Sequence, residues 1–151
     1  MSVSNARKTN ADRHLTDADF HALGAFRLAL RRFLAFSESS VAEEGLTPQQ
    51  HQAILAIRVH EGPEAMSIGE LADNLAIKNH SAVGLVGRLM ARGLVTREPA
   101  PGDRRRVLLK LTPPAEALLE TISRRNLGEL RTQAGAFADL LTTLKRLEKG
   151  G

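Results

Sequence analysis

Apolar side chains recur every three or four residues after Thr16, as in the buried stripe of an amphipathic helix. Thr16 can cap such a helix, and the negative charges of Asp17 and Asp19 suit the positive end of its dipole. The pattern predicts a helix that continues to about Ala42 and ends before Gly45. The stripe consists of Phe20, Leu23, Phe26, Leu30, Phe33 and Leu34.

Two capping boxes mark the starts of the next two helices. Thr47-Pro48-Gln49-Gln50 combines a capping threonine, a proline at the first helical position and a glutamine that can bond back to the cap. It predicts a helix that reaches about His60. Ser67-Ile68-Gly69-Glu70 repeats the capping pattern and predicts a short helix.

A fourth helix is expected after a tight turn at residues 76–78. Its apolar stripe covers residues 79–92, with Asn79 as the N-cap and Gly93 in the left-handed conformation that often ends a helix. Two short helices joined by a tight turn form a helix-turn-helix, whose second helix can enter the DNA major groove.

After Gly93 the spacing of apolar residues changes from a helical period to the period of a strand. We expect strands over residues 94–97 and 106–111, joined by a Pro- and Gly-containing turn at residues 99–103. Helix, turn, helix and β-hairpin in this order are typical of a winged helix.

Thr112-Pro113 opens a C-terminal helical region with a break expected near residues 132–135. The sequence therefore predicts a mainly α fold with a small β-hairpin wing. A winged helix-turn-helix over residues 46–112 is flanked by helices at 16–45 and 113–149, after a disordered tail at 1–15.

The flanking helices carry long apolar stripes that a winged helix does not need for its own core. Pairing of these stripes with those of a second chain predicts a homodimer. The alternative is that the flanking helices fold back on their own domain.

Charge is concentrated in one part of the chain, although the whole chain has a net charge of only +4. Residues 78–110 hold eight basic and two acidic side chains, a net charge of +6 that attracts phosphate. This segment coincides with the fourth helix and the hairpin, so double-stranded DNA is the expected partner.

Several protein classes are excluded or disfavoured by composition. The chain has no cysteine, so disulfides and thiolate metal sites are excluded. It has no long apolar stretch and no apolar signal segment, which predicts a cytoplasmic protein without a membrane span. No Gly-rich phosphate loop, nucleophile elbow or metal-binding histidine pattern is present, so we expect no enzyme activity, cofactor or metal.

The residues expected to bind DNA fall into three groups by the surface they would contact. Side chains of the fourth helix would read base edges in the major groove, the hairpin arginines would enter the minor groove with Asp103 pairing to one of them, and other cations would contact phosphate. In that order the groups are Asn79, His80, Ser81 and Arg88; Arg104, Arg105 and Arg106; and Lys78, Arg92 and Arg97.

Several segments in the right order resemble the MarR family of bacterial transcriptional regulators. They are Leu46-Thr47-Pro48-Gln49-Gln50, Ile68-Gly69-Glu70-Leu71-Ala72, Arg88-Leu89-Met90-Ala91-Arg92-Gly93-Leu94-Val95, Gly102-Asp103-Arg104-Arg105-Arg106 and Leu109-Lys110-Leu111-Thr112. The wing of the family has the form Asp, any residue, Arg, which falls here on Asp103 and Arg105.

The resemblance implies a homodimeric, sequence-specific repressor that binds an inverted-repeat operator. It also implies a pocket between the dimer helices and the DNA-binding lobe, where a small, often aromatic and anionic, ligand releases DNA. Arg27, Arg31 and His51 are the polar residues expected to line that pocket.

Two other functions fit parts of the same pattern. A constitutive architectural DNA-binding protein would share every DNA-binding feature but would show little sequence preference. A winged-helix module that binds an acidic protein surface would use the same basic segment but would bind no duplex at low salt.

Overall fold

The computed structural model describes residues 14–149 and divides the chain into two compact units. One unit is Ser37–Arg125, and the other combines Met1–Phe36 with Asn126–Gly151. Residues 1–13, which make up most of the tail expected at residues 1–15, lie outside the described part of the chain. Among the described residues, no helix is long and apolar enough to cross a membrane.

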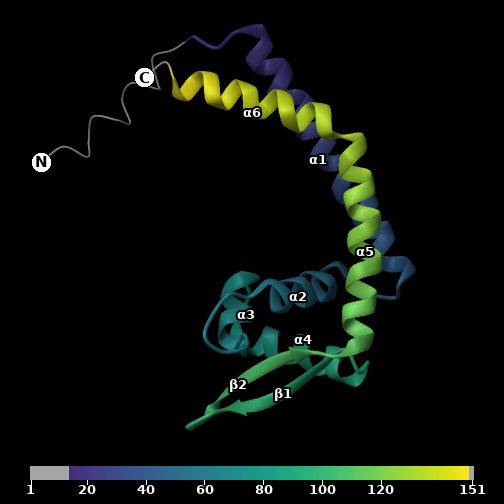
Figure 1. Ribbon diagram of the computed structural model, residues 1–151, viewed down its shortest axis with the longest axis vertical. Helices are drawn as coiled ribbons and strands as arrows, with labels where there is room; N and C mark the ends of the chain where they lie inside the picture. Colours follow the sequence, from purple (N-terminus) through teal and green to yellow (C-terminus); the bar gives the residue numbers. More distant parts are fainter. Residues whose placement is uncertain (1–13, 150–151) are drawn as a thin grey trace, which may run out of the picture. The chain divides into compact units, whose positions relative to one another are not determined.

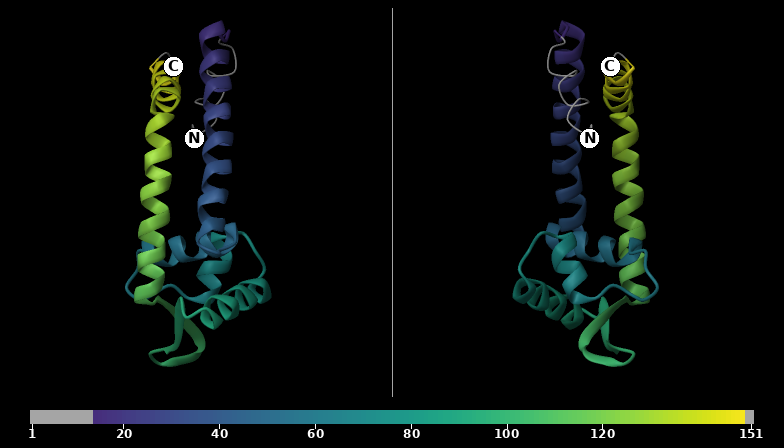
Figure 2. Two further views of the ribbon diagram at one scale, coloured as in Figure 1. Left: turned by 90° about the vertical axis from the view of Figure 1, so that its right-hand side faces the viewer. Right: turned by 90° about the vertical axis from the view of Figure 1, so that its left-hand side faces the viewer.

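The Ser37–Arg125 unit contains the predicted helix-turn-helix and hairpin (Figure 1). α2 (Pro48–Val59) leads to α3 (Ile68–Asn74), and α4 (Asn79–Ala91) follows after a tight turn. β1 (Val95–Ala100) and β2 (Asp103–Leu111) form an antiparallel hairpin, which lies beside α4 in both views of Figure 2. The predicted mainly α fold with a two-stranded wing is confirmed.

The core of this unit forms where the inward faces of α2, α3 and α4 meet the hairpin. Leu71 and Leu89 are fully buried in it, and Leu109 brings β2 into the same cluster. The Leu109 N–H also donates to the Met66 carbonyl at 2.8 Å, so the main chain of β2 is bonded to the residues just before α3. This packing places the hairpin next to the helix-turn-helix.

Both predicted capping boxes are present. The Gln50 N–H donates to Thr47 Oγ1 at 3.1 Å, and the Thr47 N–H donates to Gln50 Oε1 at 3.0 Å. Ser67 and Glu70 exchange the same two bonds, with the Ser67 N–H donating to Glu70 Oε2 at 2.7 Å. These bonds satisfy the backbone donors that are left without partners at the start of a helix.

The predicted cap of α4 is wrong. Lys78 occupies the N-cap position in an extended conformation, Asn79 is already the first helical residue, and no side chain caps the helix. The end of α4 is as predicted, because Gly93 has a φ of 68° and follows the last turn. The exposed side chain of Asn79 therefore serves no capping role.

Both strands of the hairpin are longer than the sequence predicts, since β2 begins at Asp103 and not at residue 106. β1 begins at Val95 and continues to Ala100 instead of ending at Arg97, and Pro99 pairs opposite Val107. Proline has no N–H to donate, but it is tolerated in the edge strands of a two-stranded sheet. The register changes between Pro99 and Ala100, where the strands enter the turn.

The second unit is formed by parts of three helices. α1 (Asp17–Glu43) and α5 (Pro113–Thr132) each extend from one unit into the other, whereas α6 (Ala134–Glu148) lies wholly in this one. Gln133 interrupts the helix between α5 and α6, which confirms the break expected in this region.

Two contacts join α6 to the beginning of α1. Phe26 and Phe137 meet edge to face, with ring centroids 5.6 Å apart. Arg146 bonds to the carboxylate of Asp19, which is only 6% exposed and also accepts the N–H of Thr16 at 2.8 Å. The Thr16 bond, with a further contribution from Arg146, lowers the pKa of Asp19 below its ordinary value of 3.8.

This shift predicts a pH-dependent contribution of Asp19 to stability. Because the pKa is lower in the folded chain, the stabilisation is fully present above the unfolded value and is lost as the pH falls through the folded value. We expect Asp19→Asn to lower the melting temperature at neutral pH and the difference from wild type to close in acid. Melting curves across the acid range test this, with Asp17→Asn, exposed in the same turn, as the control. A difference that persists in strong acid would contradict the charge-based explanation.

A second stability prediction concerns the turn between α3 and α4. Ala76 has a φ of 52°, in the left-handed region that costs an L-residue about 1–2 kcal/mol. Ala76 occupies the position directly after the C-cap Leu75, and glycine is the usual residue at that position. We expect Ala76→Gly to raise the free energy of unfolding by about 0.5–1 kcal/mol, since the relief of strain exceeds the added entropy of the unfolded chain.

Urea denaturation measures this gain. Ala117→Gly is a suitable comparison because Ala117 is exposed inside α5, where glycine costs about 1 kcal/mol. A loss of stability in both variants would show that Ala76 is not strained.

Candidate nucleic-acid interface

The outer face of α4 carries hydrogen-bonding groups at its two ends. Asn79, His80 and Ser81 are exposed in the first turn, and Arg88 is exposed about two turns further on. A Cβ at Gly84 would lie 3.5 Å from Arg88 Nη1, so the arginine side chain extends over this glycine. The middle of the face is smooth and has little polar character; it consists of Val83, Gly84 and Gly87.

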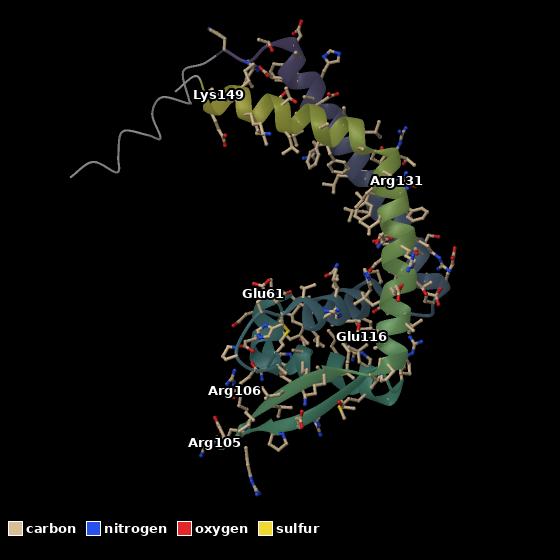
Figure 3. The ribbon with its side chains drawn as sticks, viewed as in Figure 1. Glu61, Arg105, Arg106, Glu116, Arg131 and Lys149 are labelled. Carbon is tan, nitrogen blue, oxygen red and sulfur yellow. The ribbon has the colours of Figure 1, made fainter. Side chains whose placement is uncertain are left out.

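The hairpin presents two arginines next to its turn. Arg104 and Arg105 are exposed, and Figure 3 shows Arg105 near the far end of the hairpin. The sequence predicts that Asp103 pairs with a guanidinium, but no such pair forms among residues 14–149. Asp103 Oδ1 accepts the backbone N–H of Arg105 at 3.0 Å, so the carboxylate holds the main chain of the turn. Within residues 14–149, neither Arg104 nor Arg105 has a carboxylate partner.

A cleft of about 500 Å³ joins the two surfaces. Asn79 and Val83 line it from α4, and Asp103 and Arg105 line it from β2. Residues expected to read bases and residues expected to enter the minor groove therefore border one concave surface. The sequence did not indicate that residues at the start of α3, such as Gly69, would also line this cleft.

The three cations expected to contact phosphate are not equivalent. Lys78, at the N-cap of α4, and Arg97, on β1, are exposed. Arg92 instead donates from Nη1 to the carbonyl of Gly45 at 2.5 Å and from Nη2 to that of Glu44 at 3.4 Å. Arg92 thus satisfies carbonyl groups beyond the end of α1, where the helix dipole favours a cation.

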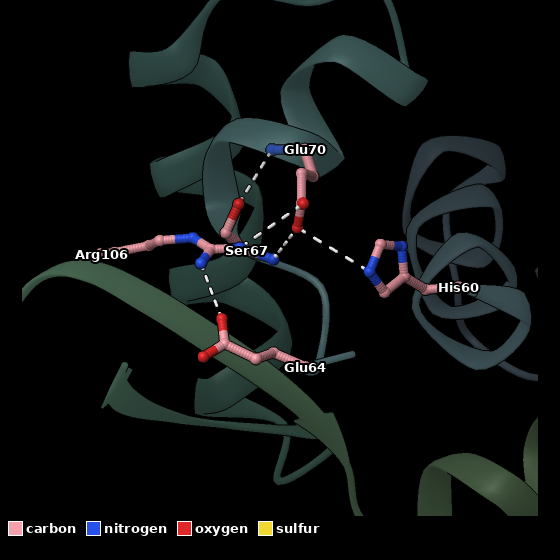
Figure 4. Close-up of polar contacts among 5 residues, drawn as sticks. All are labelled: His60, Glu64, Ser67, Glu70 and Arg106. Carbon is pink, nitrogen blue, oxygen red and sulfur yellow. Dashed lines mark hydrogen bonds and ion pairs between the residues drawn. The ribbon is translucent and has the colours of Figure 1, made fainter. Parts of the chain in front are cut away.

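Arg106 also has partners within the protein. Its Nη1 lies 2.6 Å from Glu64 Oε2, and its Nη2 lies 3.5 Å from Glu70 Oε1 (Figure 4). His60 Nε2 is 3.8 Å from Glu70 Oε2 on the other side of that carboxylate. Sequence reasoning missed the contact of Arg106 with Glu64 and that of His60 with Glu70, because no local pattern marks either pair.

The residues expected to line a ligand pocket lie in different units. Arg27 and Arg31 are exposed on α1, one helical turn apart. His51 is buried on α2, and burial lowers the pKa of its imidazole because the charged form is desolvated. His51 is therefore neutral at neutral pH.

The chemistry of the α4 and hairpin surface suits an anionic, hydrogen-bonding partner. It offers amide, imidazole, hydroxyl and guanidinium groups, which contact base edges and phosphates in protein–DNA complexes. Within the described part of the chain, no group of three or more His, Asp or Glu side chains could hold a metal ion.

The chain is similar to known transcriptional regulators over nearly its whole length. Residues 44–106 match the model of the MarR family. The transcriptional repressor NicR of Pseudomonas putida is 32% identical over 151 residues, which cover 95% of this chain and 90% of NicR.

Solved structures show the same fold. One is that of Bordetella bronchiseptica BpsR, whose DNA binding is regulated by 6-hydroxynicotinic acid; it is 28% identical, with a TM-score of 0.60 over 82% of this chain and 92% of BpsR. A mutant of E. coli MarR in complex with operator DNA is 23% identical, with a TM-score of 0.64 over 82% of this chain and 88% of that one. The chain therefore belongs to the MarR family and is a DNA-binding transcriptional regulator.

Proposed function

We propose that this regulator is a sequence-specific repressor that binds an inverted-repeat operator as a homodimer and is released by a small aromatic carboxylate. The observation that carries the proposal is the surface shared by α4 and the hairpin tip. An exposed helix with hydrogen-bonding side chains fits the major groove. Exposed arginines beside it fit the adjacent minor groove, where narrow A·T-rich tracts attract guanidinium groups.

Each exposed residue of this surface has a proposed role. Side chains at the two ends of α4 read base edges, and the apolar middle allows the helix to lie close to the groove. Asp103 orders the turn that presents the minor-groove arginines. The base-reading residues are Asn79, His80, Ser81 and Arg88; the minor-groove residues are Arg104 and Arg105; the phosphate-binding residues are Lys78 and Arg97. Arg92 and Arg106 do not belong to this set, because both are bonded within the protein.

Apolar surface on the second unit supports the homodimer. Leu127 and Leu141 are 62% and 56% exposed and line an apolar groove of about 670 Å³ with residues of α5 and α6. Large apolar patches are rare on monomers and mark interaction sites. A second copy of the chain is the proposed occupant, because a twofold dimer buries the same patch on both chains. α1 also exposes several large apolar side chains, which are Phe20, Leu23, Leu28, Leu30, Leu34 and Phe36.

Selection from a random duplex pool tests the DNA-binding proposal. At about 150 mM salt, where non-specific phosphate binding is weak, we expect enrichment of an inverted repeat with half-site centres about 10 bp apart. Enrichment of no sequence, with binding that falls steeply with salt, would favour a non-specific architectural protein. Failure to bind any duplex at low salt would favour a protein-interaction module.

The proposed effector class comes from BpsR, whose DNA binding 6-hydroxynicotinic acid regulates. Arg27 and Arg31 are exposed cations that can bind its carboxylate, and guanidinium–carboxylate pairs are strong when bidentate. Titration of the bound, selected duplex with 6-hydroxynicotinic acid tests the proposal, with pyridine-2-one, which lacks the carboxylate, as the control. We expect 6-hydroxynicotinic acid to release DNA and the control compound not to do so. The Arg27→Ala/Arg31→Ala variant should need a higher concentration of the acid for the same release. Release by neither compound would exclude this effector.

A further inference from the structure

We propose that Arg106 is a positioning residue that holds the wing in its DNA-binding orientation through Glu64 and Glu70, and that it does not itself bind DNA. We call these three residues the wing clamp. The part of this inference that concerns DNA rests on the proposed function, whereas the part that concerns the wing does not.

The clamp connects segments that are distant in the sequence. Arg106 lies on β2, Glu64 lies in the connection between α2 and α3, and Glu70 lies in the first turn of α3. The guanidinium sits between the two carboxylates, with one nitrogen 2.6 Å from Glu64 and another 3.5 Å from Glu70 (Figure 4). One planar side chain thus bonds the hairpin both to the connection between α2 and α3 and to the first turn of α3.

Arg106 attaches the hairpin to the rest of the unit at a point near the hairpin turn. The main chain of β2 is bonded to the rest of the unit at Leu109, through Met66, and at Leu108, which bridges to Ser67. Arg106 is closer to the turn than either. Among the hairpin residues that the structure describes, its side chain forms the ion pairs that reach beyond the hairpin, since Lys110 pairs with Glu98 inside it.

Glu70 is held in place independently of Arg106. Its carboxylate accepts the backbone N–H of Ser67 at 2.7 Å as part of the capping box. That bond, first among several contributions, lowers the pKa of Glu70, so the side chain is charged at neutral pH. Arg106 therefore docks against a carboxylate whose position α3 already determines.

The charge of the clamp argues against a direct role in DNA binding. The carboxylates of Glu64 and Glu70 together outweigh the single positive charge of Arg106. A cluster with an excess of negative charge does not attract phosphate. Arg104 and Arg105, which have no carboxylate partner in the described part of the chain, provide the positive charge that the operator meets.

The two roles of Arg106 predict opposite effects of removing Glu64. If Arg106 binds phosphate, Glu64→Gln leaves the Arg106 guanidinium with one carboxylate partner fewer and tightens DNA binding. If Arg106 positions the wing, Glu64→Gln releases the hairpin and weakens binding. Glu61→Gln is the matched control, because Glu61 is an exposed glutamate of the same connection without an ion pair among residues 14–149.

Binding of the full chain to the duplex selected from the random pool distinguishes these cases. We expect Glu64→Gln and Arg106→Ala each to weaken binding roughly fivefold, which corresponds to the free energy of a partly exposed ion pair. The double variant should bind no more weakly than either single variant, because each substitution removes the same interaction. Arg106→Ala should keep the wild-type salt dependence, whereas loss of a phosphate contact reduces the slope by about one. Arg106→Glu combined with Glu64→Arg should recover part of the affinity that each single charge reversal loses.

Hydrogen exchange of the DNA-free protein provides a second readout. We expect amides of residues 104–107 to exchange faster in both Glu64→Gln and Arg106→Ala, with those of α2 unchanged, which also shows that the variants are folded. Unchanged exchange in both variants would overturn the clamp even if no duplex had been selected. Tighter binding by Glu64→Gln, or additive losses with a reduced salt slope, would overturn the positioning role while leaving the proposed repressor function intact.

Discussion

Replacement of Leu141 by glutamate is expected to convert the proposed homodimer into a monomer and to weaken operator binding by at least about a hundredfold. Leu141 is 56% exposed in the single chain, so the substitution does not disturb the packing of its own unit. In a twofold dimer it would bury two unpaired carboxylates, each at a cost of several kcal/mol. A monomer presents one recognition helix, so it loses the gain from binding two linked half-sites, which is on the order of a hundredfold or more.

Light scattering after size exclusion measures the mass, and fluorescence anisotropy with a labelled operator measures the affinity. Val59→Glu is the matched control, since Val59 is 60% exposed on α2, outside the apolar groove. A Leu141→Glu protein that keeps the mass and the affinity of wild type would place the dimer interface elsewhere.

Arg105→Ala is expected to weaken operator binding by at least about 1 kcal/mol, or roughly fivefold. The side chain is exposed near the tip of the hairpin, and the bond from its N–H to Asp103 fixes its backbone. If it enters the minor groove, the loss should be largest for operators with A·T-rich flanks, where the groove is narrow. Replacing those flanks with G·C pairs should then weaken wild type more than Arg105→Ala.

Arg124→Ala provides the control for the change in net charge. Arg124 is exposed on α5 and pairs with Glu120 four residues earlier, away from the hairpin. We expect its removal to change affinity little. Equal binding by wild type and Arg105→Ala would remove the wing from the proposed interface and leave DNA recognition to α4.

Local sequence patterns predicted the elements of this fold well, for a physical reason. Capping boxes at Thr47 and Ser67 and the left-handed Gly93 involve bonds between residues at most a few positions apart, so their partners can be seen in the sequence. The errors arose where local signals compete. Asn79 is a good capping residue, but the chain reaches helical conformation one residue earlier, so Lys78 takes the cap position.

Partners of the candidate DNA-binding residues were harder to predict. Arg92 and Arg106 have the same local signature as Arg104 and Arg105, a basic residue in a basic segment. What separates them is a carbonyl group at Gly45 and a carboxylate at Glu64, each more than forty residues away in the sequence. Composition and spacing identify the charge of such a residue, whereas only the packing of α1, α3 and the hairpin identifies what the charge binds.

Glu70 serves two elements at once, since it completes the cap of α3 and receives Arg106 from β2. This sharing has a consequence for chimeric regulators. A hairpin grafted from a relative without an arginine at this position would leave Glu64 and Glu70 uncompensated next to the DNA. A grafted α3 without Glu70 would lose one of the two bonds of its capping box and one ion pair with the hairpin. Segments 64–70 and 103–107 are therefore joined by these contacts, and we expect a grafted hairpin to keep its orientation only when both segments are moved together.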